Sequence, residues 1–286
     1  MATCPLCNQQ SDRWEAIRGF EIAQCRQCSH RFVAASLGVD HVASTYGDDY
    51  FCGGGAGYDD YLSQRNLLTA RGQQFAEMVS RYTGKRGRVL DVGAAAGFLL
   101  SGWLAAGWSG LGVEPNQTMC QEGKAKGLDL RCGTFETADL DDVETIDCVS
   151  MVQVLSHFQS PRQAMERACS VLSPGGVLLI ETWNRSSWIA TISGKGWHEY
   201  SPPSVLHWFT PKCLDQLANT LGLEKVASKR SSRWINVGHA KSLLKHASQE
   251  SKLYAVANQF ARLLPDSLSL PYPGDDLFWA LYRKAN

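Results

Sequence analysis

The chain has 286 residues and a mass of 31.5 kDa, which is enough for one large α/β domain and a small module, and its 44% hydrophobic residues can bury a core. Its 28 basic and 28 acidic side chains balance, so the composition gives no sign of the broad basic surface of a nucleic-acid-binding protein. Composition describes the whole chain and does not test for a local basic patch. No apolar run approaches the roughly 20 residues that cross a bilayer, and the first residues lack the apolar core of a signal peptide. We therefore expect a cytoplasmic protein without a membrane span.

The first 32 residues contain two CxxC pairs. Cys4 and Cys7 form one pair, Cys25 and Cys28 form the other, and this spacing is typical of a four-thiolate zinc site. We predict a zinc ribbon over residues 1–32, in which the zinc is structural because four thiolates leave no coordination position for a substrate or water. Two unrelated cysteine pairs are the alternative. In a reducing compartment we expect free core or surface thiols at the six scattered cysteines, Cys52, Cys120, Cys132, Cys148, Cys169 and Cys213.

Residues 33–60 are rich in glycine and tyrosine, which predicts a linker that orders over a ligand. Tyr46 and Tyr50 are the candidates to close over that ligand, and a purely structural linker is the alternative. From about residue 60 to residue 82, apolar residues recur at helical spacing. We expect a lead-in helix there, and a larger domain over residues 61–286.

Strand-like and helix-like segments then alternate. The predicted strands cover residues 87–93, 109–115, 128–133, 146–155, 175–183, 223–230 and 276–284. The predicted helices cover residues 97–107, 116–127, 160–173 and 210–222. This alternation predicts an α/β fold with a Rossmann-like, seven-stranded, mostly parallel sheet and helices on both faces. Residues 231–272 are expected to form a helical insertion that could act as a lid.

The stretch "VLDVGAAAGFLL", residues 89–100, predicts a ligand site where the first strand of this series turns into a helix. Glycine lets a ligand approach the main chain, and the helix N-terminus offers unpaired N–H groups. A dinucleotide fingerprint would need three glycines at positions that hold Gly93, Ala95 and Phe98, which disfavours a pyrophosphate. Glu114 ends the next strand at the spacing of a ribose-binding carboxylate. A ligand with a ribose and without a pyrophosphate is therefore expected.

Five segments in order resemble the successive motifs of class I S-adenosylmethionine-dependent methyltransferases. They are "VLDVGAAAGFLL", "GLGVEPN", "GTFETADL", "IDCVSMVQVLSHFQSP" and "LSPGGVLLIETWN". The resemblance covers roughly residues 60–285, and the four-cysteine ribbon followed by "YGDDYF" is similar to the layout of many small-molecule members of this group. It implies S-adenosylmethionine as the cofactor and a small organic molecule as the methyl acceptor.

The resemblance also implies which residues hold the cofactor. Asp91, Gly93 and Gly97 match the motif for the methionine part, and Glu114 matches the ribose-binding acid. The full set implied is Tyr50, Asp91, Gly93, Ala94, Gly97, Phe98, Glu114, Pro115, Thr134, Phe135, Val152 and Gln153, with Thr134 and Phe135 beside the adenine. Ala95 departs from the glycine usual in the family, and we expect its methyl group to tighten the fit rather than prevent binding.

Transfer to a hydroxyl or an acidic carbon requires a base, and histidine is suited to this role near neutral pH. His157 and His207 are the candidate catalytic bases, with a helix cap or a buried packing role as the alternatives. Candidate substrate contacts are Gln153, Trp183, His198 and Tyr200. The alternative is core and loop packing for Trp183, and a solvated loop for His198 and Tyr200.

The leading hypothesis is a methyltransferase acting on a small organic hydroxyl or acidic carbon in natural-product, glycan or lipid biosynthesis. A sugar C-methyltransferase is an alternative, although such enzymes typically carry a further C-terminal domain. An RNA-modifying methyltransferase is another, although the ribbon shows no basic stripe. A non-catalytic scaffold with a retained cofactor site is the third. The acceptor, the atom methylated and the oligomeric state are not indicated by the sequence.

Overall fold

The computed structural model describes residues 2–35, 37–38, 40–53, 60–143, 145–231, 234–238, 241, 259, 263–265, 268–271 and 274–285. Most of the predicted insertion at 231–272 lies outside these residues, including all but three residues of its helix-like segment 251–264. Among the described helices, none has the length and apolar character needed to cross a bilayer.

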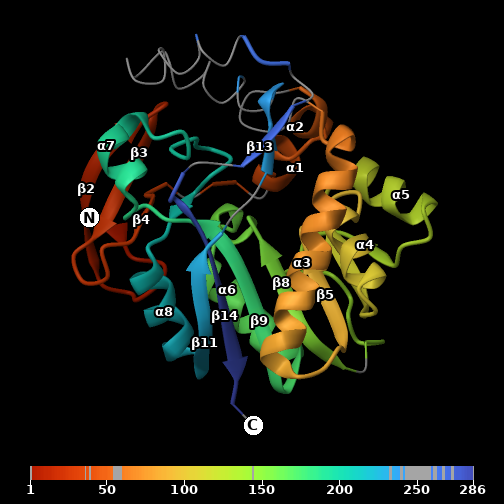
Figure 1. Cartoon of the computed structure of the whole chain (residues 1–286). Helices are drawn as coiled ribbons and strands as arrows, with labels where there is room; N and C mark the ends of the chain where they lie inside the picture. The colour runs from red at the N-terminus through yellow and green to blue at the C-terminus, as the bar shows by residue number, and fades with distance from the viewer. Residues whose placement is uncertain are drawn as a thin grey trace.

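The larger domain is built on a seven-stranded sheet in the order β11-β14-β9-β8-β5-β6-β7 (Figure 1). Its strands are β5 (Arg88–Val92), β6 (Ser109–Glu114), β7 (Leu130–Cys132), β8 (Ile146–Val152), β9 (Leu172–Trp183), β11 (Leu223–Arg230) and β14 (Leu277–Lys284). The strands β5 to β9 are parallel, and β14 is antiparallel to both of its neighbours. The predicted α/β fold with a mostly parallel sheet is confirmed.

Helices cover both faces of this sheet. On one face lie α3 (Arg65–Thr83), α4 (Phe98–Ala105) and α5 (Gln117–Ala125), and on the other α6 (Pro161–Val171) and α8 (Pro211–Thr220). Side chains alternate between the faces along each strand, so Val89 packs toward α3 and Leu90 toward α6. Both faces are therefore apolar, as expected for a sheet buried on both sides.

The carboxyl ends of the parallel strands meet at one edge of the sheet. The turns after β5, β6 and β8 lie there, and two short helices, α1 (His41–Thr45) and α2 (Asp48–Cys52), lie above them (Figure 1). A short 3-10 helix, η1 (Leu62–Gln64), leads into α3, and another, η2 (Leu155–His157), follows β8. Ligands of such sheets bind at this edge.

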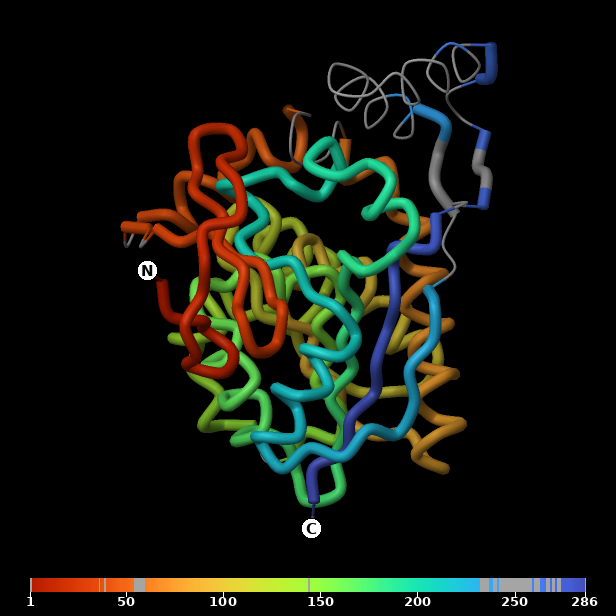
Figure 2. Tube along the Cα trace, turned by 90° about the vertical axis from the view of Figure 1, so that its left-hand side faces the viewer, coloured from red at the N-terminus to blue at the C-terminus, as the bar shows by residue number. Residues whose placement is uncertain are grey.

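The N-terminal ribbon shares a sheet with the larger domain. Strands β1 (Ala2–Thr3), β2 (Gln10–Ile17), β3 (Phe20–Cys25) and β4 (Arg31–Val33) are continued by β10 (His207–Trp208) in the order β1-β2-β3-β4-β10. Figure 2 shows the red ribbon lying against the teal segment that leads to β10. A separate pair, β12 (Trp234–Asn236) with β13 (Ser269–Pro271), joins the two ends of the predicted insertion.

The structure corrects the prediction that all six scattered cysteines are free thiols. Cys120 on α5 and Cys132 at the end of β7 form a disulfide, with their Cα atoms 5.7 Å apart. The error has a physical reason: helix and strand bring these residues together only after α5 packs beside β7. Of the remaining four, Cys148 and Cys213 are buried free thiols, Cys169 is half-buried and Cys52 is exposed.

Candidate active site

A cavity of about 330 Å³ opens at the carboxyl edge of the sheet. The turns after β5, β6 and β8 form its floor, and α1 and α2 cover it. The predicted site residues that line it are Tyr50, Gly93, Glu114, Pro115, Thr134, Phe135, Val152, Gln153 and His157. Eight of the twelve expected cofactor residues and one of the two candidate bases therefore share one cavity.

Glu114 ends β6 with both carboxylate oxygens anchored to the main chain. Oε2 accepts a hydrogen bond from the N–H of Ala95 at 2.7 Å, and Oε1 accepts one from the N–H of Asn116 at 2.7 Å. Burial raises the pKa of Glu114 to about 7, and the two N–H donors oppose that shift. Each oxygen keeps a second lone pair, so the carboxylate can accept from two neighbouring hydroxyls of a ligand.

The turn after β5 depends on backbone conformations that favour glycine. Gly93 has φ 70°, and a Cβ there would lie 2.5 Å from Cγ1 of Val154. Ala95 has φ 48°, which is unusual for a residue with a side chain. The other predicted cofactor residues of this turn do not line the cavity but lie behind its wall: Asp91, Ala94, Gly97 and Phe98. Burial raises the pKa of Asp91 to about 7, and the nearby charge of Glu114 adds to this effect.

Asn116 ties the cover of the cavity to the end of β6. Its Oδ1 accepts from the N–H of Met119 at 2.8 Å and so caps α5. Its Nδ2 donates to the carbonyl of Tyr46 at 3.0 Å and to Oδ1 of Asp48 at 3.1 Å. The segment 46–48 is therefore held beside Glu114, and the rings of Tyr46 and Tyr50 pack edge to face above the cavity.

His157, in η2, is held by the carbonyl of Ser204. Its Nδ1 lies 2.6 Å from that oxygen, and the hydroxyl of Tyr46 donates to the same oxygen at 2.6 Å. A carbonyl only accepts, so Nδ1 carries the hydrogen and the neutral ring keeps the lone pair of Nε2 as its acceptor. Burial lowers the pKa of His157, while the carbonyls of Ser204 and Gln153 oppose that shift. The ring is therefore neutral near pH 7 and able to accept a proton.

A buried ion pair beside the cavity was not predicted from the sequence. Arg71 of α3 pairs with Glu181 of β9, and Ser231 donates to the same carboxylate. Nε2 of Gln153 donates to Oε1 of Glu181 at 3.1 Å, which orients the Gln153 side chain at the cavity wall. The only sequence signal was an acid inside the otherwise apolar strand "GVLLIETW".

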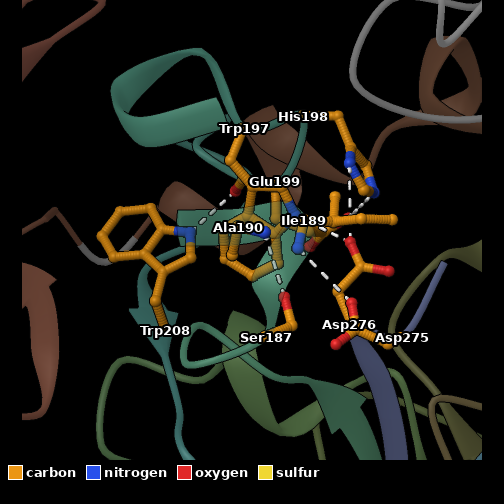
Figure 3. A network of polar contacts seen from close by, with 9 residues as sticks. All are labelled: Ser187, Ile189, Ala190, Trp197, His198, Glu199, Trp208, Asp275 and Asp276. Atoms are coloured by element: carbon orange, nitrogen blue, oxygen red, sulfur yellow. Dashed lines mark hydrogen bonds and ion pairs between the residues drawn. The ribbon is translucent and has the colours of Figure 1, made fainter. Parts of the chain in front are cut away.

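Three predicted substrate contacts gather away from this cavity. His198 lies with Nδ1 4.0 Å from Oδ2 of Asp276, beside Trp197, whose Nε1 donates to the same oxygen at 2.8 Å (Figure 3). Trp183 packs edge to face on His198, with ring centroids 4.8 Å apart. Tyr200 accepts a hydrogen bond from Arg31 of the ribbon at 2.6 Å. None of the three residues lines the 330 Å³ cavity.

The second candidate base, His207, faces the ribbon. Its Nδ1 lies 3.0 Å from Nε2 of His30, and the two rings stack. Burial lowers the pKa of His207 to about 4. His207 lines a separate cavity of about 300 Å³ beside β4, so the structure does not bring it together with His157 around one ligand space.

The four ribbon cysteines converge on one point. Their Sγ atoms all lie within 4.8 Å of one another, with Cys4 to Cys28 at 3.7 Å, Cys7 to Cys25 at 3.5 Å and Cys7 to Cys28 at 3.6 Å. Tetrahedral Zn–S bonds of about 2.3 Å place sulfurs about 3.8 Å apart, so the donor set fits zinc. The hydrogen bond between them raises the pKa of Cys4 and lowers that of Cys28 to about 5.

The fold places a cavity lined by a buried acid and a histidine at the carboxyl edge of a seven-stranded sheet. Residues 61–228 match the family described as "Methyltransferase domain", and the chain belongs to that family. This match agrees with the resemblance of its motifs to those of methyltransferases.

Curated relatives include two enzymes named ubiquinone biosynthesis O-methyltransferase. The one from Bradyrhizobium sp. (strain ORS 278) is 31% identical over 165 residues, or 51% of this chain and 64% of that protein. The one from Rhodopseudomonas palustris (strain BisB5) is 28% identical over 149 residues, or 48% of this chain and 58% of that protein. The matches thus span less than two thirds of these relatives.

Similar solved structures support the fold alone. A methyltransferase from Thermotoga maritima, described as a possible histamine N-methyltransferase, has a TM-score of 0.51 and 19% identity over 79% of this chain and 93% of its own. A putative methyltransferase from Bacillus halodurans has a TM-score of 0.54 and 13% identity over 75% of this chain and 99% of its own.

Proposed function

We propose that this chain transfers the methyl group of S-adenosylmethionine to a hydroxyl or an acidic carbon of a small organic acceptor. The observation that carries the proposal is that Glu114 and His157 line the same cavity. Glu114 offers two acceptor oxygens suited to a ribose, and His157 is a neutral base. A cavity of about 330 Å³ lies in the usual size range of small-molecule sites.

The residues that line the cavity would hold the cofactor in one orientation. Glu114 would accept the ribose hydroxyls, with Thr134 and Phe135 beside the base and Gly93 beside the methionine part. Arg71 brings a cation to the wall of the cavity, where the carboxylate of the methionine part would be stabilised. When bound, the cofactor supplies a methyl group on a positively charged sulfur. The protein's contribution is to align the acceptor with that methyl group and to exclude water.

His157 would remove the proton of the acceptor as the new bond forms. The proton moves from the acceptor to Nε2, and the imidazolium that results is stabilised through Nδ1 by the carbonyl of Ser204. Gln153, fixed by Glu181, would donate to the acceptor or accept from it. Because His207 lies against the ribbon, we assign the role of base to His157 alone.

The names of the curated relatives support an oxygen acceptor. Two of them are named as ubiquinone biosynthesis O-methyltransferases, so we propose a hydroxyl as the acceptor group ahead of a carbon. The pathway, whether natural-product, glycan or lipid biosynthesis, is left open by this proposal.

We further propose that the ribbon holds one structural zinc ion through Cys4, Cys7, Cys25 and Cys28. The spacing of the four sulfurs supports this assignment, and four thiolates close the coordination sphere. Metal analysis of the purified protein should find about one zinc per chain, and Cys4→Ser should lose it. A chain without zinc that keeps the same structure would contradict the assignment.

The methyltransferase proposal is tested in two stages. Titration calorimetry with S-adenosylhomocysteine should show one site per chain. Acceptors with a hydroxyl beside an aromatic or acidic group are then screened with S-adenosylmethionine carrying a labelled methyl group. With a productive acceptor, His157→Gln should slow methyl transfer by roughly 100-fold or more while binding of S-adenosylhomocysteine stays within about twofold. Wild-type rates in this variant would remove His157 from the role of base.

A further inference from the structure

The ribbon and the candidate base are connected by a continuous set of backbone hydrogen bonds. Phe32 of β4 pairs with His207 of β10, and the N–H of Val33 donates to the carbonyl of Leu206 at 2.9 Å. The N–H of Leu206 in turn donates to the carbonyl of Ser156 at 2.9 Å, and Ser156 directly precedes His157. Two bonds from one residue, Leu206, therefore join the ribbon strand to the 3-10 turn that carries the base.

Arg31 reinforces this connection with its side chain. Its Nη1 donates to the hydroxyl of Tyr200 at 2.6 Å, and its guanidinium lies 3.5 Å from the centroid of the Trp14 ring. The Tyr200 ring also packs against Trp208 of β10, with centroids 5.0 Å apart. Arg31 thus bridges the ribbon and both ends of the segment from Tyr200 to Trp208.

That segment contains the carbonyl that orients the base. The oxygen of Ser204 receives bonds from Nδ1 of His157 and from the hydroxyl of Tyr46. A backbone carbonyl moves only with its own chain segment. The segment is held by β4, Arg31 and Tyr200. These groups therefore determine the position of the Ser204 carbonyl oxygen to which Nδ1 of His157 donates.

We propose that the ribbon is a positioning element of the active site, and that Arg31 and the β4–β10 pairing hold the Ser204 carbonyl so that it selects the Nδ1-protonated form of His157. The proposal rests on the assignment of His157 as the base. Metal binding supplies much of the folding free energy of such small cysteine modules, so metal in the ribbon would stabilise this arrangement. Arg31 acts through Tyr200 and Ser204 and is a positioning residue.

The test uses the full chain with ¹⁵N-labelled histidine and needs no acceptor. Long-range ¹H–¹⁵N NMR spectra distinguish the two neutral tautomers of each ring, and the signals of His157 are identified by their loss in His157→Gln. Wild-type protein should show His157 with its hydrogen on Nδ1 and a titration midpoint below that of free histidine. Arg31→Ala should show a mixture of tautomers and a still lower midpoint, because the Ser204 carbonyl that opposes the lowering of the His157 pKa no longer faces Nδ1.

Arg26→Ala is the matched control. Arg26 is an exposed ribbon arginine whose ion pair with Asp12 is exposed on both sides. Its loss should leave the His157 spectrum unchanged. The titratable groups that face His157 are Tyr46, His41 and His207, and neither arginine substitution removes them.

Two further measurements keep the outcome decisive. If Arg31→Ala does not fold, Tyr200→Phe removes only the hydroxyl that Arg31 binds and should move the His157 tautomer ratio in the same direction. Zinc-depleted protein, prepared with a chelator, should do so as well. An unchanged His157 spectrum in the folded variant and in the zinc-depleted protein would overturn the proposal. Binding of S-adenosylhomocysteine, measured on the same samples, reports on the proposed function separately and should change by less than about twofold.

Discussion

The N–H of Ala95 donates to Oε2 of Glu114 at 2.7 Å, which joins the turn after β5 to the acid at the end of β6. The carboxylate that faces the cavity is therefore also part of the backbone structure of the turn. Substitutions at either residue are expected to affect both cofactor binding and local stability, and the two effects can be measured separately.

Replacing Glu114 with glutamine is expected to weaken binding of S-adenosylmethionine by about 1–3 kcal/mol. The amide keeps only one acceptor oxygen for the ribose. Its NH₂ group faces one of the two backbone N–H groups that donate to Glu114, and that N–H loses its acceptor. Titration calorimetry measures the change. Glu122→Gln, an exposed substitution on α5, is the control and should bind like the wild type. Equal affinities for the two variants would refute the ribose assignment.

Cofactor affinity is expected to increase as the pH is raised from about 6 to about 8. Burial raises the pKa of Glu114 to about 7, so the carboxyl is largely protonated at the lower pH. Ribose hydroxyls and a cationic sulfur both favour the ionised form, so binding should release a proton when it begins from the protonated state. Calorimetry in buffers of different ionisation enthalpy measures this proton. An affinity that falls over the same range would show that the acid binds in its neutral form.

Ala95→Gly is expected to stabilise the protein by up to about 1 kcal/mol. The residue has φ 48°, a conformation that costs an L-amino acid about 1 kcal/mol and costs glycine nothing. The greater conformational entropy of glycine in the unfolded chain offsets part of this gain. Urea unfolding gives the free energy. Its neighbour Ala96, which is fully buried and does not have a positive φ, is the control, and Ala96→Gly should destabilise by about 1 kcal/mol. Equal losses in both variants would contradict the strain at Ala95.

Breaking the disulfide between Cys120 and Cys132 is expected to lower the free energy of unfolding by about 3 kcal/mol, because the bond closes a short loop in the unfolded chain. Urea unfolding with and without a reducing agent measures the difference, and Cys132→Ser should match the reduced wild type. Cys52→Ser, at an exposed free thiol, should respond to the reducing agent as the wild type does. If reduction leaves the wild-type midpoint unchanged, the bond does not stabilise the protein.

The sequence by itself determined the sheet and the glycine-containing turn at its carboxyl edge. The alternation of strand-like and helix-like segments is local, and a parallel sheet places the ends of all its strands on one edge, so Gly93 and Glu114 could be assigned to one site before any contact was known. The two CxxC pairs likewise predicted a four-thiolate site, because each pair lies on a short turn and the spacing between the pairs is typical of such a site. Both predictions rest on short, local sequence patterns.

Only the tertiary structure decided which residues contact and orient the candidate base and the side chains around it. His157 is hydrogen-bonded to the carbonyl of Ser204, 47 positions away in the sequence, and Glu181 forms an ion pair with Arg71, 110 positions away. His207, which the sequence presented as equal to His157, faces His30 of the ribbon across 177 positions. No periodicity or spacing encodes such pairs, because they arise from how the loops at the strand ends and the ribbon pack on the finished sheet. Local patterns therefore predicted the fold and which candidate cofactor residues lie at one edge of the sheet, and long-range packing decided how the candidate base is oriented.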